Sequence, residues 1–331
     1  MSNASLPADD GLIQAILGPD GPERRRALAK AITLIESTRE DHRQRADDVL
    51  NALLPHSGNA FRIGISGVPG VGKSTFIEAL GLLLIERGER VAVLAVDPSS
   101  AVGGGSILGD KTRMERLSMD PRAFIRPSPS SGTLGGVADK TREAIRLCEA
   151  AGFTVVLVET VGVGQSEAAV AGMTDLFVLL QLPNAGDDLQ AIKRGVTELA
   201  DLIVVNKADL DADAATGARS QFVSALKIMG HRDQAWRPEV LQVSALDGTG
   251  MEEFWQAACR FREVQTSSGG FEQRRRAQDQ SWMWERIEAG LRERFRRHPD
   301  VRAALTSLSD EVREGRVAAS VAARRLLDLF N

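Results

Sequence analysis

Short runs of apolar residues recur along the central part of the chain, and amphipathic stretches separate them. Such a run is typical of a strand that is buried on both faces of a parallel sheet. The pattern predicts strands just before Gly67 and at 91–96, 123–126, 154–158, 176–180, 202–205 and 240–243. Because helical patterns alternate with these runs, we expect an α/β fold with a mostly parallel, helix-wrapped sheet and with functional residues at the carboxyl ends of the strands.

Helical patterns also extend the chain on both sides of the predicted sheet. An apolar stripe runs through 22–54 in two pieces, and Trp284, Ile287 and Leu291 recur at helical spacing near the other end. Residues 1–20 show no such periodicity and carry Asn, Pro, Asp and Gly, so a flexible lead-in is expected. The predicted divisions are the lead-in at 1–20, an N-terminal helical extension at 21–58, a nucleotide domain at 59–264 and a C-terminal helical arm at 265–331.

A glycine-rich turn follows the first predicted strand, and a helical pattern follows the turn. Gly67, Gly72, Lys73 and Ser74 match G-x-x-x-x-G-K-[ST], whose backbone N–H groups curl around a polyphosphate. Lys73 is expected to reach the β- and γ-phosphates, and Ser74 to offer its hydroxyl to Mg²⁺. A chance glycine-rich turn is the alternative, but the strand before it and the helix after it favour a phosphate loop. The loop comprises Gly67, Val68, Pro69, Gly70, Val71, Gly72, Lys73, Ser74 and Thr75.

A second motif, N-K-x-D, directly follows the run at 202–205. Asp209 can accept hydrogen bonds from the N1–H and the exocyclic amine of guanine, whereas adenine would present an acceptor at N1. Lys207 would lie along the base, and Asn206 would brace the loop. The motif therefore predicts GTP and GDP as ligands. An accessory loop after the next strand, whose backbone N–H can donate to guanine O6, consists of Ser244, Ala245 and Leu246.

A carboxylate ends the buried run at 154–158, where most GTPases have D-x-x-G. Glu159 is expected to reach Mg²⁺ through water, and the Gly162 N–H to touch the γ-phosphate, so that hydrolysis releases the loop. Val163 stands where many signalling GTPases place a water-orienting Gln, and Gln165 is out of register. We therefore expect slow intrinsic hydrolysis that a partner stimulates.

Two further aspartates bracket a glycine-rich segment after the run at 91–96. Asp97 and Asp110 could hold Mg²⁺ or position the attacking water, while the alternatives are a turn residue for Asp97 and a helix N-cap for Asp110. We count both with Lys73, Glu159 and Gly162 as candidate catalytic residues. The candidate metal ligands are Ser74, Asp97 and Glu159.

Composition narrows the partners and the compartment. The net charge of −4 gives no electrostatic case for binding nucleic acid or an anionic membrane, and the basic clusters at 24–26 and 274–276 are interpreted as solvated helix faces. Cys148 and Cys259 lie in helical patterns and indicate a reducing compartment rather than a disulfide framework. With no apolar run long enough to span a bilayer, a cytoplasmic protein without nucleic-acid or membrane partners is expected.

Together these motifs closely resemble the MeaB family, which includes the human methylmalonic aciduria type A protein and the ArgK-type proteins. The resemblance is carried by the phosphate loop, the aspartate-bracketed segment 96–114, the stretch 159–166 and the N-K-x-D motif at 206–209. It covers nearly the whole chain from about residue 22 onward. The family shares Glu in place of Asp at the Mg²⁺ loop, which accounts for Glu159.

The resemblance implies a P-loop GTPase that binds methylmalonyl-CoA mutase, gates loading of adenosylcobalamin and protects or reactivates the mutase. It implies that the loop 181–193, by pattern alone a helix start with dipole-complementing acids, is a third switch. There Asp187, Asp188 and Lys193 would signal to the mutase together with Gln165. It also implies a homodimer formed through the C-terminal arm, and only indirect involvement with adenosylcobalamin.

Within the same fold, a nickel-insertion GTPase is an alternative function. Such proteins carry metal on clustered His or Cys, whereas His42, His56, His231 and His298 are scattered without ligand spacing.

Two alternatives come from other classes of protein. An ATP-dependent transport kinase would bind adenine, against which the N-K-x-D motif argues. A cobalamin carrier would need a D-x-H-x-x-G segment, and the sequence has none.

Overall fold

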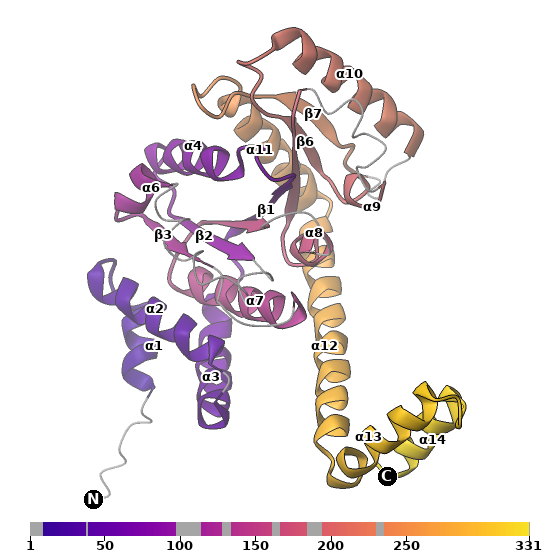
Figure 1. The fold of residues 1–331 in the computed structure, drawn as a ribbon. Helices are drawn as coiled ribbons and strands as arrows, with labels where there is room; N and C mark the ends of the chain where they lie inside the picture. Colours follow the sequence, from indigo (N-terminus) through magenta and orange to yellow (C-terminus); the bar gives the residue numbers. More distant parts are fainter. Residues whose placement is uncertain are drawn as a thin grey trace, which may run out of the picture. The chain divides into compact units, whose positions relative to one another are not determined.

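A computed structural model describes most of the chain (Figure 1). The described residues are 9–37, 39–96, 114–127, 134–160, 166–183, 194–229 and 235–330.

A single sheet of seven strands forms the centre of the described chain, in the order β3-β2-β4-β1-β5-β6-β7. Every neighbouring pair is parallel, which confirms the predicted parallel α/β architecture. The strands are β1 Phe61–Gly67, β2 Val91–Val96, β3 Ala123–Arg126, β4 Val155–Thr160, β5 Leu176–Gln181, β6 Leu202–Val205 and β7 Glu239–Gln242.

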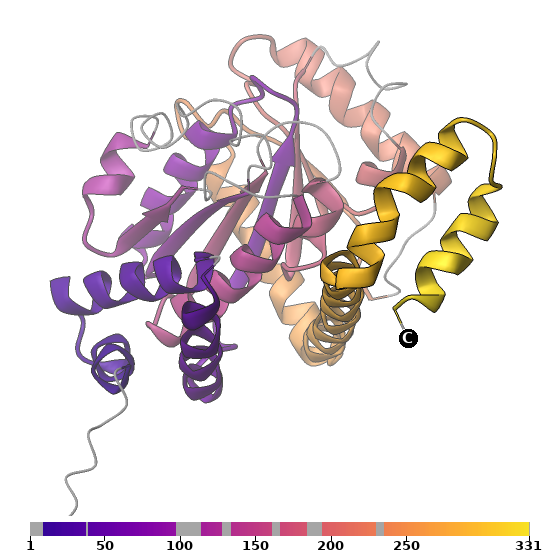
Figure 2. The same ribbon diagram turned by 60° about the horizontal axis from the view of Figure 1, so that its bottom comes forward.

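Helices cover both faces of the sheet because its strands are apolar on both sides (Figure 2). Along β2, Val91 and Val93 join the core of one face, and Ala92 and Leu94 join the core of the other. The first core takes in side chains of α4 Lys73–Glu86, α6 Glu115–Met119 and α11 Met251–Ser267. The second takes in side chains of α7 Leu134–Ala150, α8 Ser166–Ala171, α9 Arg194–Thr197 and α10 Ala212–Met229, with the N-terminal helices.

The helices that precede the sheet in the chain pack on the second core. They are α1 Asp10–Leu17, α2 Pro22–Glu36 and α3 Glu40–Leu53, followed by the short 3-10 helix η1 Leu54–His56. The expectation of a flexible lead-in at 1–20 is wrong over α1. Leu12, Ile13 and Ile16 form a short apolar face, and Ile16 is fully buried. The flanking Pro, Asp and Gly residues hid this face in the composition.

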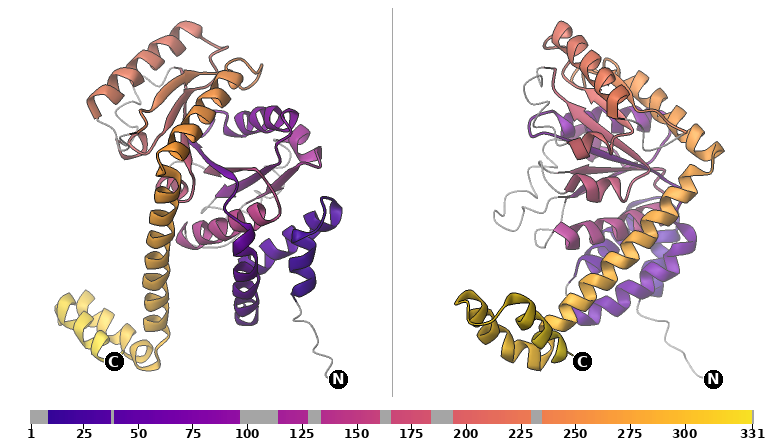
Figure 3. Two further views of the ribbon diagram at one scale, coloured as in Figure 1. Left: turned by 180° about the vertical axis from the view of Figure 1, so that it is seen from behind. Right: turned by 90° about the vertical axis from the view of Figure 1, so that its right-hand side faces the viewer.

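Residues 273–331 form a second compact unit, which begins later in the chain than the arm expected at 265. Its described helices continue from α12 Gly270–Arg297, which follows α11 in the chain (Figure 3), through α13 Pro299–Arg313 to α14 Ala319–Asp328. Val301 and Leu326 lie in a small core between α13 and α14, and the rings of Phe295 and Phe330 meet edge to face with centroids 5.5 Å apart. In contrast, α12 has no buried residue.

None of the helices in the described part of the chain has the length and apolar character needed to cross a lipid bilayer.

Candidate nucleotide site

The phosphate loop joins the carboxyl end of β1 to the first turn of α4. A Cβ atom at Gly67 would lie 2.6 Å from the Leu180 carbonyl oxygen, and one at Gly72 would lie 2.8 Å from Asn206 Nδ2. Gly72 also has a φ of 93°, in the left-handed region that favours glycine. A side chain at Gly67 or Gly72 would therefore collide with a neighbouring strand or loop, and a side chain at Gly72 would also strain the turn.

Lys73 begins α4, and its ammonium group folds back over the phosphate loop. Nζ donates to the carbonyl oxygens of Gly67 at 2.8 Å and Val68 at 3.3 Å. Burial lowers the pKa of Lys73, while the charges of Glu159 and Glu167 act in the opposite direction. A buried cation with two carbonyl partners is suited to exchange them for phosphate oxygens.

Ser74 and Glu159 come together although they are far apart in the sequence. The Ser74 hydroxyl donates to Glu159 Oε1 over 3.4 Å, and Glu159 is only 6% exposed near the end of β4. A hydroxyl and a carboxylate are hard oxygen ligands of the kind that Mg²⁺ takes together with phosphate oxygens. These residues therefore fit a nucleotide-bound Mg²⁺. The described chain contains no group of three or more His, Cys, Asp and Glu residues placed to hold a metal by themselves.

Asn206 connects three loops at the candidate base site. Its buried side chain donates from Nδ2 to the Val71 carbonyl oxygen at 2.8 Å and accepts at Oδ1 from the Ala245 N–H at 3.1 Å. Lys207 has a φ of 60°, which turns the chain sharply after β6. Asp209 follows as an exposed side chain. The N-K-x-D motif is thereby bonded to both the phosphate loop and the accessory loop.

The accessory loop is a tight turn after β7. The Ser244 N–H donates to the Thr249 carbonyl oxygen at 2.9 Å, and the Gly248 N–H donates to the Ser244 carbonyl oxygen at 2.9 Å. The Ala245 N–H is already engaged by Asn206. Among the described residues, no hydrogen bond engages the Leu246 N–H.

The structure adds Glu167 to the residues recognised from the sequence. It lies in the first turn of α8, is 5% exposed, and its charge acts on Lys73. Glu167 directly follows the stretch 159–166, which begins at the carboxyl edge of the sheet, and this position in the sequence could have identified it as a site residue.

Several predicted site residues lie outside the described part of the chain. They are Asp97, Asp110, Gly162, Gln165, Asp187, Asp188 and Lys193.

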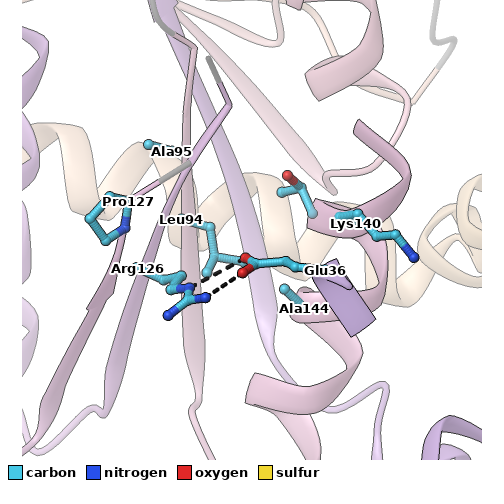
Figure 4. A pocket seen from close by; sticks show the side chains of 8 residues that line it. Glu36, Leu94, Ala95, Arg126, Pro127, Lys140 and Ala144 are labelled. Carbon is cyan, nitrogen blue, oxygen red and sulfur yellow. Dashed lines mark hydrogen bonds and ion pairs between the residues drawn. The ribbon is translucent and has the colours of Figure 1, made fainter. Parts of the chain in front are cut away.

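A small pocket near the carboxyl ends of β2 and β3 lies next to the N-terminal extension (Figure 4). Its volume of about 10 Å³ has room for roughly one water molecule. Arg126 at the end of β3 forms an ion pair with Glu36 at the end of α2, and Lys140 of α7 also lines the pocket. The pocket cannot hold a nucleotide, but the ion pair fastens the extension to this edge of the sheet.

The chain is similar to known GTPases over most of its length. The sequence profile described as "Methylmalonyl Co-A mutase-associated GTPase MeaB" matches residues 28–300. A protein of Mycobacterium tuberculosis named a probable GTPase is 55% identical over 97% of this chain and 95% of its own length. The mouse mitochondrial methylmalonic aciduria type A homolog is 47% identical over 93% of this chain and 77% of its own length.

Among solved structures, one named as an LAO/AO transport system kinase has a similar fold. It is 38% identical, covers 98% of this chain and 99% of its own, and has a TM-score of 0.78. The family profile and these relatives extend over the phosphate loop, the N-K-x-D motif and the sheet that positions them. The chain belongs to the MeaB family of methylmalonyl-CoA mutase-associated GTPases.

Proposed function

We propose that this protein is a GTP-hydrolysing chaperone that binds methylmalonyl-CoA mutase, gates the loading of adenosylcobalamin and protects or reactivates the mutase. The observation that carries the nucleotide part is the Asn206 side chain, which bonds both Val71 of the phosphate loop and Ala245 of the accessory loop. These two hydrogen bonds hold the N-K-x-D loop, which would recognise the base, against the phosphate loop and the accessory loop. Family membership supports the mutase as partner.

In this proposal, Lys73 binds the β- and γ-phosphates, and Ser74 and Glu159 hold Mg²⁺, which supplies charge neutralisation on the phosphates. Burial lowers the pKa of Lys73, and the charges of Glu159 and Glu167 oppose this effect. Asp97 and Asp110 hold the metal or the attacking water, and the Gly162 N–H senses the γ-phosphate. Since Val163 offers no group to orient water, the intrinsic rate is slow and the mutase stimulates it.

Signalling to the mutase is assigned to Gln165 and to the third switch, with Asp187, Asp188 and Lys193. A loop that follows β5 starts at the same edge of the sheet as the phosphate loop, because parallel strands end together there. The γ-phosphate and the partner surface can therefore share this edge. Adenosylcobalamin is involved through the mutase.

We further propose a cytoplasmic homodimer that forms through α12. Trp284 is 56% exposed, Leu291 51% and Ile287 41%, and the three side chains recur at helical spacing. An exposed apolar stripe of this kind favours pairing with a second helix.

The deciding experiment is a pull-down of purified protein with methylmalonyl-CoA mutase, carried out with GDP and with a non-hydrolysable GTP analogue. We expect the amount of captured mutase to depend on which nucleotide is bound, and Lys73→Ala to remove that dependence. Capture that is the same with either nucleotide would contradict the gating role.

Lys193→Ala is expected to spare basal hydrolysis and to weaken its stimulation by the mutase.

The similar solved structure carries the name of a transport kinase, so ATP is the competing ligand to test. Calorimetry with ATP and GTP is expected to show binding of GTP alone at micromolar concentrations. Equal affinities would support the kinase instead.

A further inference from the structure

The edge strand β3 carries an open groove that the nucleotide site does not use. The groove has a volume of about 540 Å³ and is lined by residues of α2, the end of α6 and β3. Figure 1 shows where these three elements lie. Its lining residues are Pro22, Arg25, Arg26, Ala29, Ser118, Phe124, Ile125, Arg126 and Pro127.

Backbone groups along the groove are available for pairing. The Val91 N–H of β2 donates to the Arg122 carbonyl oxygen, and Ala92 is the register partner of Phe124. Because alternate residues of a parallel strand turn their N–H and C=O groups to opposite sides, Ile125 turns both groups outward. Within the described residues, no hydrogen bond engages either group. An extended segment lying along this edge could therefore exchange a pair of hydrogen bonds with Ile125.

The wall of the groove is positively charged on one side. Pro22, Arg25, Arg26 and Ala29 share one face of α2, at a spacing of three and four residues. In the described part of the chain, Arg24 is paired with Asp20, but neither Arg25 nor Arg26 has an ion-pair partner. The charge of Arg25 does act on Asp120, whose pKa is lowered chiefly by its hydrogen bond with Arg122 and to a smaller extent by Arg25, so Arg26 is the less engaged of the two arginines.

The other charged groups near the groove are mutually neutralised. Arg126 is paired with Glu36, and Arg122 with Asp120. The groove therefore keeps a net positive charge beside β3, where the side chains of Phe124 and Ile125 are buried in the two cores of the sheet. An occupant needs carboxylates for the arginines and a free backbone for Ile125.

We propose that this groove, bounded by α2, β3 and α6, binds an extended acidic segment of a partner protein, which adds to the sheet as a strand at Ile125 and places carboxylates against Arg25 and Arg26. The strand addition supplies pairing that does not depend on sequence, and the arginines supply the selection for acidic segments.

The test uses the full chain and a defined probe, an acetylated and amidated octapeptide of alternating Glu and Val labelled with a fluorophore. Anisotropy at low salt is expected to show saturable binding. Arg25→Glu combined with Arg26→Glu should raise the Kd by about tenfold or more, since each lost charged hydrogen bond is of that order. Lys227→Glu combined with Arg237→Glu, an equal charge change at exposed residues near β7, should leave the Kd unchanged.

Two further probes separate strand addition from attraction by charge. An octapeptide of alternating Glu and N-methyl-Val has the same charge but lacks alternate N–H donors, and it should bind about tenfold more weakly or not at all. A single-stranded thymidine octanucleotide should not compete. The proposal is overturned if the Glu–Val peptide fails to bind, if the Arg25 and Arg26 reversals leave its Kd unchanged, if the methylated peptide binds equally well, or if the oligonucleotide competes.

Discussion

Individual residues of the candidate nucleotide site make contacts that join one loop to another. Asn206 is bonded to Val71 and Ala245, and Gly72 lies where only a hydrogen fits beside the Asn206 amide. The motif G-x-x-x-x-G-K-[ST] and the motif N-K-x-D are therefore parts of one structure. A change in the loop that carries Asn206 would therefore also disturb the phosphate loop and the accessory loop.

Asp209→Asn should exchange the preferred base. The substituted amide keeps one acceptor for N1–H but presents a donor to the position of the exocyclic amine, which suits the carbonyl group of xanthine. We expect GTP affinity to fall by about tenfold to a hundredfold and xanthosine triphosphate affinity to rise. Calorimetry with both nucleotides measures the change. GTP affinity equal to that of the unmodified protein would show that Asp209 does not touch the base.

A buried ion pair at the opposite end of β1 should matter for stability. Glu149 accepts from Arg62 Nε at 2.7 Å and from the Gly58 N–H at 2.8 Å, and its side chain is fully buried. Glu149→Gln leaves the Arg62 charge buried without its counter-ion. We expect the free energy of unfolding to drop by about 3 to 5 kcal/mol, measured by urea denaturation.

The matched control for that substitution is Glu252→Gln. Glu252 is paired with Arg87 at the surface, where both side chains are more than a third exposed. Such a solvent-exposed pair contributes little to stability, so the free energy of unfolding should hardly change. If Glu149→Gln and Glu252→Gln lowered the free energy of unfolding by similar amounts, burial would not be what makes the Arg62–Glu149 pair matter for stability.

Whole elements were predicted from the sequence with unequal success, for physical reasons. The strands at 91–96 and 202–205 were identified because both of their faces are buried, so no polar position interrupts them. The helix α1 was missed because its apolar face is short and is held in place by packing on α2. The phosphate loop and the N-K-x-D motif are continuous in sequence and were recognised, whereas the influence of Glu167 on Lys73 arises from tertiary folding.

The docking of α1 should depend on pH. Asp9, just before α1, accepts from Arg45 Nη2 at 2.7 Å and Nε at 3.0 Å, and this hydrogen bonding lowers the pKa of Asp9 from its ordinary value. A lowered carboxyl pKa stabilises the folded state above the ordinary value of 3.8, and that stabilisation is lost as the pH falls through the lowered pKa. Asp9→Asn should therefore increase hydrogen exchange in α1 at neutral pH.

The difference between Asp9→Asn and the unmodified chain should shrink as the pH is lowered, since protonated Asp9 resembles Asn. Hydrogen exchange of α3, which carries Arg45, should change less than that of α1. An α1 whose exchange at neutral pH is the same in both proteins would show that the Asp9–Arg45 pair does not hold it.

In the whole molecule, the candidate nucleotide site lies in one compact unit, and the C-terminal helices from Gln273 onward form another. The unit that ends at Glu272 contains the sheet and both of its cores, and Phe271 packs against Phe61 with ring centroids 6.0 Å apart. The unit from Gln273 onward has its own small core. The sequence placed this boundary at 265 because the break at Ser267–Gly270 is visible there, while the Phe271 contact forms only in the folded protein.

A chain that ends at Glu272 should therefore fold and bind GTP with an affinity within about threefold of the full chain, because no residue of the candidate site lies beyond this point. Sedimentation should show a monomer, since the exposed Trp284, Ile287 and Leu291 have been removed. Ending the chain at Gln265 instead should lower stability, because Phe61 then loses the ring of Phe271. A dimeric 1–272 chain would place the dimer contact outside α12, and loss of GTP binding would mean that the C-terminal unit supports the nucleotide site.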